Sequence, residues 1–241
     1  MGWFNGWFST PWYKVLYKHR DMEDAAGLVL PLIEKGKLQY GHSVLDMGCG
    51  RGRHAAIFVK AGMEVTGIDL SKASIDDAAR KVPEAHFEVH DIREPYATGR
   101  FDAVVCLFTS LGYSNDMDDD RKAVAAAAKA LKPGGLFVLD LMNGEFVAQH
   151  LVPTESKVIE GVHFRIERLL EGTDIVKRIN VRHGEQNEDF EERVHAWKLS
   201  EVTGMILEAG LELEDVTDGS CLQPFEPERS DRIIAWARKK S

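Results

Sequence analysis

Apolar residues between positions 43 and 141 gather in short runs, and amphipathic stretches separate these runs. The apolar runs predict buried strands, and the stretches between them repeat their apolar positions at helical spacing. Ser71 and Gly62 stand where one helix should begin and another should end. Strict alternation of strand and helix predicts an α/β fold with a doubly wound, mostly parallel, Rossmann-like sheet and right-handed crossovers. The predicted strands are residues 43–45, 64–68, 86–90, 101–107 and 136–141, and the predicted helices are residues 53–61, 71–81 and 117–131.

The pattern changes to alternation of apolar and charged residues between positions 157 and 197. Residues 162–166 and 175–181 each alternate in this way, although Lys177 interrupts the apolar side of the second run. Between them, residues 171–174 (EGTD) read as a hairpin turn. We therefore expect two or three antiparallel strands inserted after the fifth strand.

The C-terminal part returns to the first pattern. A helix capped by Ser200 and ending at Gly210 is followed by two strands, at residues 211–216 and 232–237, which bring the main sheet to seven strands. A chain of 241 residues with 44% hydrophobic content can bury one substantial core. We predict a single domain, residues 1–241, made of an N-terminal helical cap (1–40), a cofactor-binding core (41–150), an inserted antiparallel sheet (151–198) and a C-terminal part of the core (199–241).

Aromatic residues crowd the N-terminal cap. Helical spacing runs from Pro11 to Glu23, and residues 25–33 predict a second amphipathic helix that ends near Gly36. Two interpretations stay open for Tyr13, Tyr17 and Arg20, which share or adjoin one helical face: they offer phenols and a guanidinium to a bound carboxylate, or they pair on the surface. The aromatic residues expected to pack the cap against the main body are Trp3, Phe4, Trp7 and Phe8.

Residues 43–52, SVLDMGCGRG, carry the strongest chemical signal. Glycine tolerates positive φ and leaves the backbone bare, so this strand-to-helix turn suits a flat, polar ligand that bears a nucleoside. Asp46 adds a carboxylate that would attract a cationic group and repel a pyrophosphate. Asp69 and Asp91 follow the next two strands, at the edge where open parallel sheets bind ligands. An acid after the second strand commonly accepts hydrogen bonds from ribose hydroxyls.

Composition narrows the set of partners. The net charge of −9 argues against a nucleic-acid-binding face, which needs lysines and arginines to displace counterions. Cys49, Cys106 and Cys221 are odd in number and widely spaced, which favours neither a disulfide framework nor a zinc site and predicts a reducing, cytoplasmic location. Neither a signal sequence nor a membrane-spanning run is present in the pattern.

These residues together resemble the class I S-adenosylmethionine-dependent methyltransferases, in their small-molecule branch. Residues 46–52 are similar to the family's acidic-x-G-x-G-x-G loop, and residues 131–135 (LKPGG) to the turn before its fifth strand. The resemblance covers residues 43–141 well and the part after residue 200 by topology. It implies that Asp69 binds ribose, that Asp91 meets the adenine amino group, and that no metal is required. The implied cofactor-binding residues are Tyr17, Arg20, Asp46, Gly48, Cys49, Gly50, Gly52, Asp69, Leu70, Asp91, Ile92 and Leu107.

The family implies S-adenosyl-L-methionine as methyl donor, S-adenosyl-L-homocysteine as product and in-line attack by a nitrogen, oxygen or carbon of the acceptor. The main alternative is an NAD(P)-dependent oxidoreductase, but its G-x-G-x-x-G turn needs a glycine where this chain has Arg53. A non-catalytic nucleoside-binding protein of the same fold also stays open. The sequence leaves the oligomeric state undetermined.

The segment after the fourth strand bears on the acceptor. Nucleic-acid amine methylases have an acidic or amide residue, two prolines and an aromatic residue there, whereas this chain has residues 107–110, LFTS. We therefore expect a small-molecule acceptor rather than a nucleic acid. Tyr113, in the following loop, is the candidate for a general base. His54 is expected to pack near the glycine turn and His90 to be structural, while His150, His163 and His195 either face the acceptor or lie on the surface.

Overall fold

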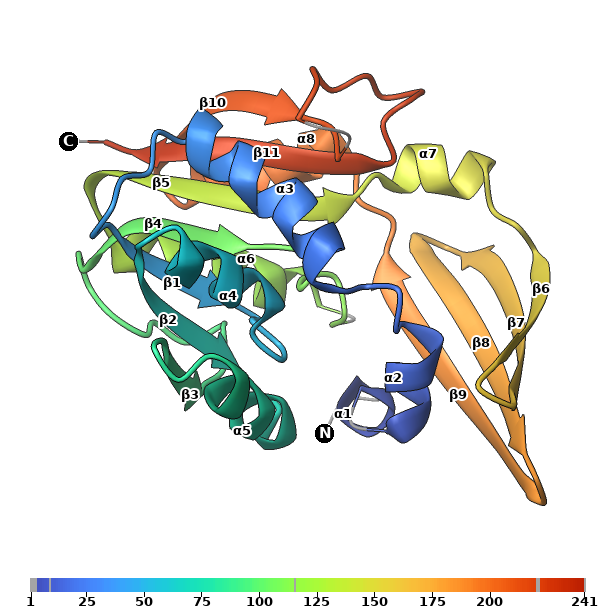
Figure 1. Cartoon of the computed structure of the whole chain (residues 1–241). Coiled ribbons are helices and arrows are strands. Elements are labelled where there is room, and N and C mark those ends of the chain that lie inside the picture. The colour runs from blue at the N-terminus through green and yellow to red at the C-terminus, as the bar shows by residue number, and fades with distance from the viewer. Residues whose placement is uncertain (1–3, 9, 115, 220–221, 241) are drawn as a thin grey trace.

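A seven-stranded sheet forms the centre of the computed structural model, which describes residues 4–8, 10–114, 116–219 and 222–240 (Figure 1). Its strands are β1 (Ser43–Met47), β2 (Glu64–Asp69), β3 (His86–Val89), β4 (Phe101–Cys106), β5 (Leu131–Met142), β10 (Leu211–Thr217) and β11 (Arg232–Lys239). They lie in the order β10-β11-β5-β4-β1-β2-β3. The first five strands are parallel, and β11 runs antiparallel to both of its neighbours.

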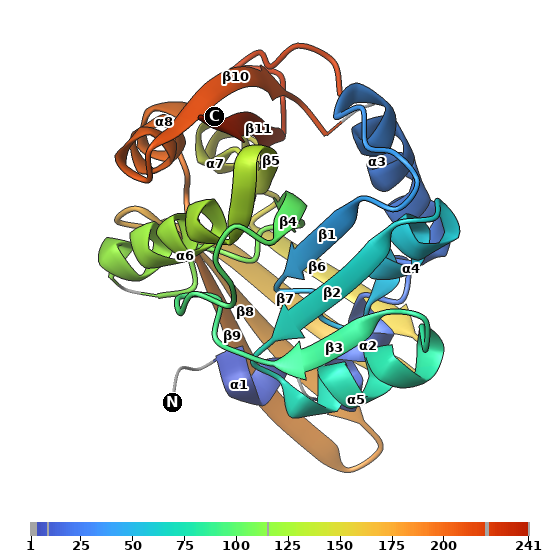
Figure 2. The same cartoon turned by 90° about the vertical axis from the view of Figure 1, so that its left-hand side faces the viewer.

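Helices cover both faces of this sheet (Figure 2). On one face lie α3 (Met22–Lys35), α4 (Arg53–Lys60) and α5 (Lys72–Lys81), and on the other lie α6 (Met117–Ala130) and α8 (Leu199–Glu208). Adjacent strand residues point to opposite layers, so Val44 packs with α3 and α4 while Leu45 packs with α6 and α8. The predicted fold class is confirmed. No helix in the described ranges is both long and apolar enough to cross a bilayer.

A second sheet stands beside the first, and it contains four antiparallel strands rather than the predicted two or three. The strands are β6 (Thr154–Ile159), β7 (Val162–Glu171), β8 (Asp174–His183) and β9 (Gln186–His195), and α7 (Gly144–Gln149) connects this sheet to β5. The extra strand, β6, is a mostly exposed edge strand without an apolar side, so its sequence carries no alternation signal. The predicted hairpin turn between β7 and β8 is confirmed.

The first part of the predicted cap packs on the inner face of this inserted sheet, whereas its last part, α3, packs on the central sheet. From here on, the cap means the first part. Its two short helices are α1 (Phe4–Trp7) and α2 (Pro11–Leu16). Trp7 and Leu16 are buried against apolar residues of β7 and β8, including Phe164 and Ile179. Trp7 is thus a packing residue of the cap, but its partners lie in the inserted sheet and not in the main body as expected. Trp3, the side chain of Phe4 and Cys221 lie outside the described residues.

Among the element boundaries that differ from the predictions, three have a clear structural reason. The helix predicted from Pro11 to Glu23 is α2, which ends at Leu16. A new helix, α3, follows, and the carboxylate of Asp21 caps it by accepting hydrogen bonds from the backbone N–H groups of Glu23 and Asp24. Ser200 is not the cap of α8, which starts at Leu199 after Lys198. The third difference concerns β5, which begins at Leu131 instead of residue 136. The expected turn nevertheless persists as a bulge, because the pairing with β4 jumps from Leu131 to Leu136.

Candidate active site

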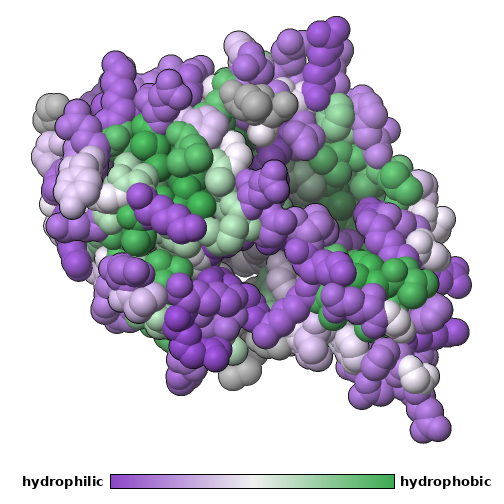
Figure 3. All heavy atoms as spheres, viewed as in Figure 1, coloured by the Kyte–Doolittle hydropathy of each residue, from purple (hydrophilic) through white to green (hydrophobic). Residues whose placement is uncertain are grey.

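A cavity of about 1440 Å³ lies between the carboxyl ends of the parallel strands and the inserted sheet with its cap. Figure 3 shows it as a hollow with a mainly hydrophilic rim. Sites for one drug-sized ligand usually measure about 300–1,000 Å³, so this cavity has room for two small molecules. The residues predicted for the site that line it are Tyr17, Arg20, Gly48, Cys49, Gly50, Asp69, Leu70, Asp91, Ile92, Leu107 and Tyr113; Asp46 and Gly52 do not.

The glycine turn forms one wall of the cavity. Gly48, Gly50 and Gly52 all have positive φ, at 71°, 53° and 76°. A methyl group built on Gly48 would come within 2.7 Å of Ser110, whereas one built on Gly50 meets nothing within 4 Å. The backbone is therefore packed against the protein at Gly48 and open at Gly50. Cys49 and Cys106 are buried free thiols, and burial raises the pKa of each.

Asp46 lies beneath the turn instead of in the cavity wall. It is buried, and its Oδ2 has no hydrogen-bond partner among the described residues. Burial, reinforced by the nearby charge of Asp69, raises the pKa of Asp46 to about 7. A buried carboxylate with an unpartnered oxygen is favourable only when a cation approaches it. The turn above Asp46 is consequently suited to a positively charged ligand.

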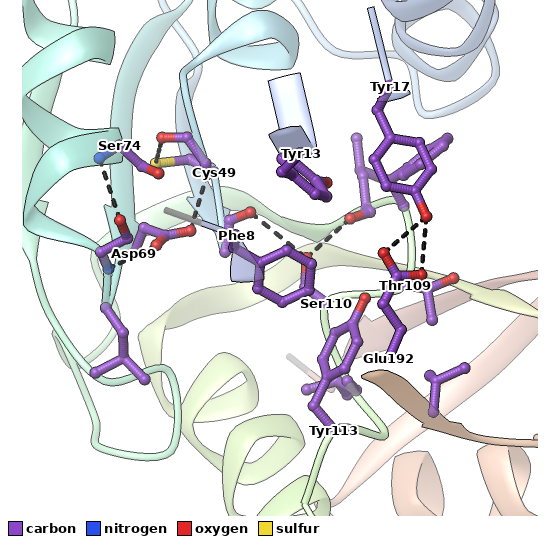
Figure 4. Close-up of a pocket in the computed structure, with 18 of the residues that line it drawn as sticks. Phe8, Tyr13, Tyr17, Cys49, Asp69, Ser74, Thr109, Ser110, Tyr113 and Glu192 are labelled. Atoms are coloured by element: carbon purple, nitrogen blue, oxygen red, sulfur yellow. Dashed lines mark hydrogen bonds between the residues drawn. The ribbon is translucent and has the colours of Figure 1, made fainter. Parts of the chain in front are cut away.

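Asp69 holds the turn and the start of α5 together. Its Oδ2 accepts a hydrogen bond from the backbone of Gly50 at 3.0 Å, and its Oδ1 accepts one from the backbone of Ser71 at 2.8 Å (Figure 4). Asp91 ends the neighbouring strand and is bound by Arg93 at 2.6 Å, which lowers the pKa of Asp91. Both carboxylates line the same cavity, so the strand ends converge as predicted.

Tyr17 and Arg20 reach the cavity from the cap. The Arg20 guanidinium lies 3.7 Å from the centroid of the Tyr17 ring and 4.5 Å from that of Phe108. Arg53 and Arg232 also stack on Phe108, at 4.4 and 5.0 Å. Arg53 is paired with Asp24 and Arg232 with Asp140, which leaves Arg20 as the guanidinium of this group without a carboxylate partner among the described residues. Arg20 can therefore bind a ligand carboxylate at this corner of the cavity. Phe108 was not predicted as a site residue, because the arginines that stack on it come from separate segments of the chain.

Glu192 of β9 connects the cap to the inserted sheet. Its carboxylate accepts hydrogen bonds from the hydroxyl of Tyr17, at 2.7 and 2.8 Å (Figure 4). It also accepts one from the indole of Trp7, at 2.5 Å. Lys177 of β8 lies 3.4 Å from Glu192 and also contacts the hydroxyl of Tyr17. Sequence reasoning did not assign Glu192 or Lys177 to the site. The interruption of the apolar side by Lys177 was the one available signal.

Tyr113 lines the cavity beside Phe8, and the two rings meet edge to face at 5.6 Å. Burial raises the pKa of Tyr113, so its phenol stays protonated at neutral pH. It can donate a hydrogen bond there but is poorly suited to accept a proton as a phenolate. Its role as general base remains a prediction.

Among the histidines discussed above, His54 lines the cavity. Burial lowers the pKa of His54 to about 3, so its ring is neutral. His90 binds the backbone of Glu94 at 3.0 Å. His150 binds the backbone of Phe146 at 2.8 Å, and His163 is exposed on β7. His195 is buried between two acidic residues behind the cavity, Asp174 and Glu201.

Comparison with known proteins agrees with this geometry. Residues 44–135 match the family of methyltransferase domains. A Saccharopolyspora spinosa protein named dTDP-4-amino-2,3,4,6-tetradeoxy-D-glucose N,N-dimethyltransferase is 35% identical over 121 residues, which are 50% of this chain and 48% of that protein. The chain thus spans about half the length of the first curated relatives it matches.

Two further relatives extend the match. A ubiquinone biosynthesis O-methyltransferase from Thiobacillus denitrificans is 30% identical over 184 residues, which are 73% of this chain and 67% of that protein. A solved S-adenosylmethionine-dependent methyltransferase from Clostridium acetobutylicum superposes with a TM-score of 0.81 at 21% identity, and the alignment covers 95% of this chain and 96% of that one. On its sequence, its fold and the site at its strand ends, this chain belongs to the class I S-adenosylmethionine-dependent methyltransferases.

Proposed function

We propose that this protein transfers the methyl group of S-adenosylmethionine to a nitrogen or oxygen of a small-molecule acceptor. One observation carries the proposal: the strand-end carboxylates and the glycine turn line the same cavity as the cap and the inserted sheet. Donor and acceptor can therefore lie side by side, screened from bulk water, as an in-line displacement requires.

Different residues of the chain bind the ribose, the adenine and the methionine part of the donor. Asp69 has lone pairs left for two ribose hydroxyls, while the open backbone of Gly50 leaves room for the nucleoside. Leu70 and Ile92 flank the adenine, and Asp91 accepts a hydrogen bond from its amino group. The unpartnered carboxylate of Asp46 acts from beneath the turn on the ammonium and sulfonium charges. Arg20, whose guanidinium stacks on the ring of Tyr17, receives the donor carboxylate.

The donor supplies an activated methyl group, so this chain mainly has to position the two reactants. The phenol of Tyr113, held protonated by burial, is placed to donate a hydrogen bond near the fourth strand end. The carboxylate of Glu192 lies on the opposite side of the cavity, where it can receive a proton through Tyr17. An amine acceptor needs this assistance less than a hydroxyl does.

The relatives support a small acceptor. One relative is named for N,N-dimethylation of an amino-sugar nucleotide, and another is named for O-methylation in ubiquinone biosynthesis. Nitrogen and oxygen acceptors are thus both represented among the relatives of this chain. An amino sugar or another small amine or alcohol is the acceptor we propose, and the net charge of −9 favours it over a nucleic acid. We also propose a cytoplasmic location, which suits the buried free thiols.

Thermal denaturation with two ligands tests the donor assignment. S-adenosylhomocysteine at a hundred times its Kd should raise the Tm by about 5–10 °C, whereas NADH should leave it unchanged. Labelled S-adenosylmethionine should then pass its methyl group to members of a panel of amines and hydroxyl compounds. Stabilisation by NADH and not by S-adenosylhomocysteine would favour the oxidoreductase alternative and contradict the proposal.

A further inference from the structure

Three charged side chains form a row across the inner face of the inserted sheet. Arg168 of β7 is paired directly with Lys177 of β8, and Lys177 is paired with Glu192 of β9. All three line the cavity, with side chains only 21%, 14% and 18% exposed. The rest of this face is mainly apolar, and it packs against the cap.

The order of charges in this row is unfavourable in itself, although each cation has a carboxylate within reach. Two cations stand directly opposite each other, and like charges at such positions destabilise an antiparallel pair. The outer face of the same strands shows the favourable arrangement, because there Arg178 is paired with Glu167 on one side and with Glu191 on the other. The sheet thus neutralises its exposed row and leaves its half-buried row with two adjacent cations.

The carboxylates within reach do not neutralise the inner cations equally. Arg168 donates to Glu155 at 2.7 Å, on the side away from Lys177, and to the backbone of Val152. Glu192 lies near Lys177 but also accepts hydrogen bonds from Tyr17 and Trp7. Burial lowers the pKa of Lys177, and the charges of Arg168 and Arg20 lower it further while Glu192 opposes them. Three cations, Arg20, Arg168 and Lys177, thus share two carboxylates, Glu155 and Glu192.

Apolar residues border the cationic pair on the side of α7. Ile175 and Val194 are paired with each other in neighbouring strands and line the cavity, as do Val147 and Leu151. A ligand lying here would place an apolar body on these residues and an anionic group on the cations.

We propose that Arg168 and Lys177 bind an anionic group of the methyl acceptor, a carboxylate or a phosphate. The inference rests on the proposed function, since it locates the acceptor half of the same cavity. The acceptor is accordingly a small acid or phosphate ester whose nucleophilic amine or hydroxyl reaches back toward the donor. Lys177 provides a point charge, and the guanidinium of Arg168 can bind two oxygens of one anionic group.

Calorimetric titration of the protein saturated with S-adenosylhomocysteine tests this inference. The probes are benzoate, phenyl phosphate and benzyl alcohol at constant ionic strength, which share an apolar ring and differ in charge. Either anion should bind at least about tenfold more tightly than benzyl alcohol, and the better of the two identifies the group. Lys177→Met and Arg168→Met should each remove most of this preference. Arg178→Met, on the outer face of the same strand as Lys177, should retain it.

The outcomes separate the two proposals. Failure of every variant and of the wild type to bind S-adenosylhomocysteine contradicts the proposed function. Normal binding of that product together with equal affinity for all three probes, or with no probe binding at all, overturns the anionic acceptor. Lys177→Met also removes a contact with Tyr17, so Arg168→Met provides an independent test. Arg168 makes its hydrogen bonds to Glu155 and Val152, and not to residues assigned to the donor.

Discussion

Substituting Gly50 by alanine separates the cost of backbone strain from the cost of filling the donor site. Gly50 has a φ of 53°, and a methyl group there would meet nothing within 4 Å. Ligand-free Gly50→Ala should therefore lose only the penalty of a left-handed backbone, about 1–2 kcal/mol of unfolding free energy. Gly161, in the turn between β6 and β7, is a matched control because its φ is 78° and its surroundings are equally open.

The two variants should differ in binding. The added methyl group at Gly50 projects from the cavity wall and should cost about 1–3 kcal/mol of affinity for S-adenosylhomocysteine, roughly 5–150-fold. Gly161→Ala should bind as the wild type does. Calorimetry gives the affinities, and urea unfolding gives the stabilities. Equal affinity of Gly50→Ala and wild type would refute the idea that the nucleoside lies on the bare turn.

Two further predictions concern the acids. Asp69→Ala should weaken binding of S-adenosylhomocysteine by about 1.5–3 kcal/mol, whereas Asp76→Ala, which removes an exposed carboxylate of the following helix α5, should not. Unchanged calorimetric affinity of Asp69→Ala would count against the ribose assignment. Asp46 ionises near 3.8 when unfolded and at about 7 when folded, so the folded state holds an extra proton between these values and loses stability as the pH rises through them. In urea unfolding of the ligand-free protein, Asp46→Asn should flatten this pH dependence and be more stable than wild type above about pH 7; parallel pH curves would contradict the assignment.

Much of the core was predictable because its signals are local. A buried strand, a bare turn and an acid after each strand occur within a few residues, and parallel topology then brings Asp69 and Asp91 to one edge. The family, the fold class and the cofactor are confirmed on this basis. Asp46 was expected to face the ligand, but its carboxylate is buried beneath the turn and does not line the cavity. Its position at the end of a strand does not determine on which side of the turn the side chain lies.

The acceptor half was not predictable, because its signals depend on pairing between distant segments. Lys177 and Glu192 look like ordinary charged strand residues until the register sets them side by side. The cap helix was expected to continue past Leu16, since helical spacing persists to Glu23 and Asp21 was not recognised as a new cap. The acceptor half of the cavity and the position of the cap depend on tertiary contacts with the inserted sheet.

The hydrogen bonds to the carboxylate of Glu192 determine which parts of the molecule belong together. Since it accepts hydrogen bonds from Trp7 and Tyr17, α1 and α2 are attached to β9 of the inserted sheet, and they share the small core of that sheet. This unit also meets the loop after β4, through the stacking of Arg20 on Phe108 and of Phe8 on Tyr113. The cap helices and the inserted sheet therefore form one continuous outer wall, and the donor half and the acceptor half of the cavity lie against it together.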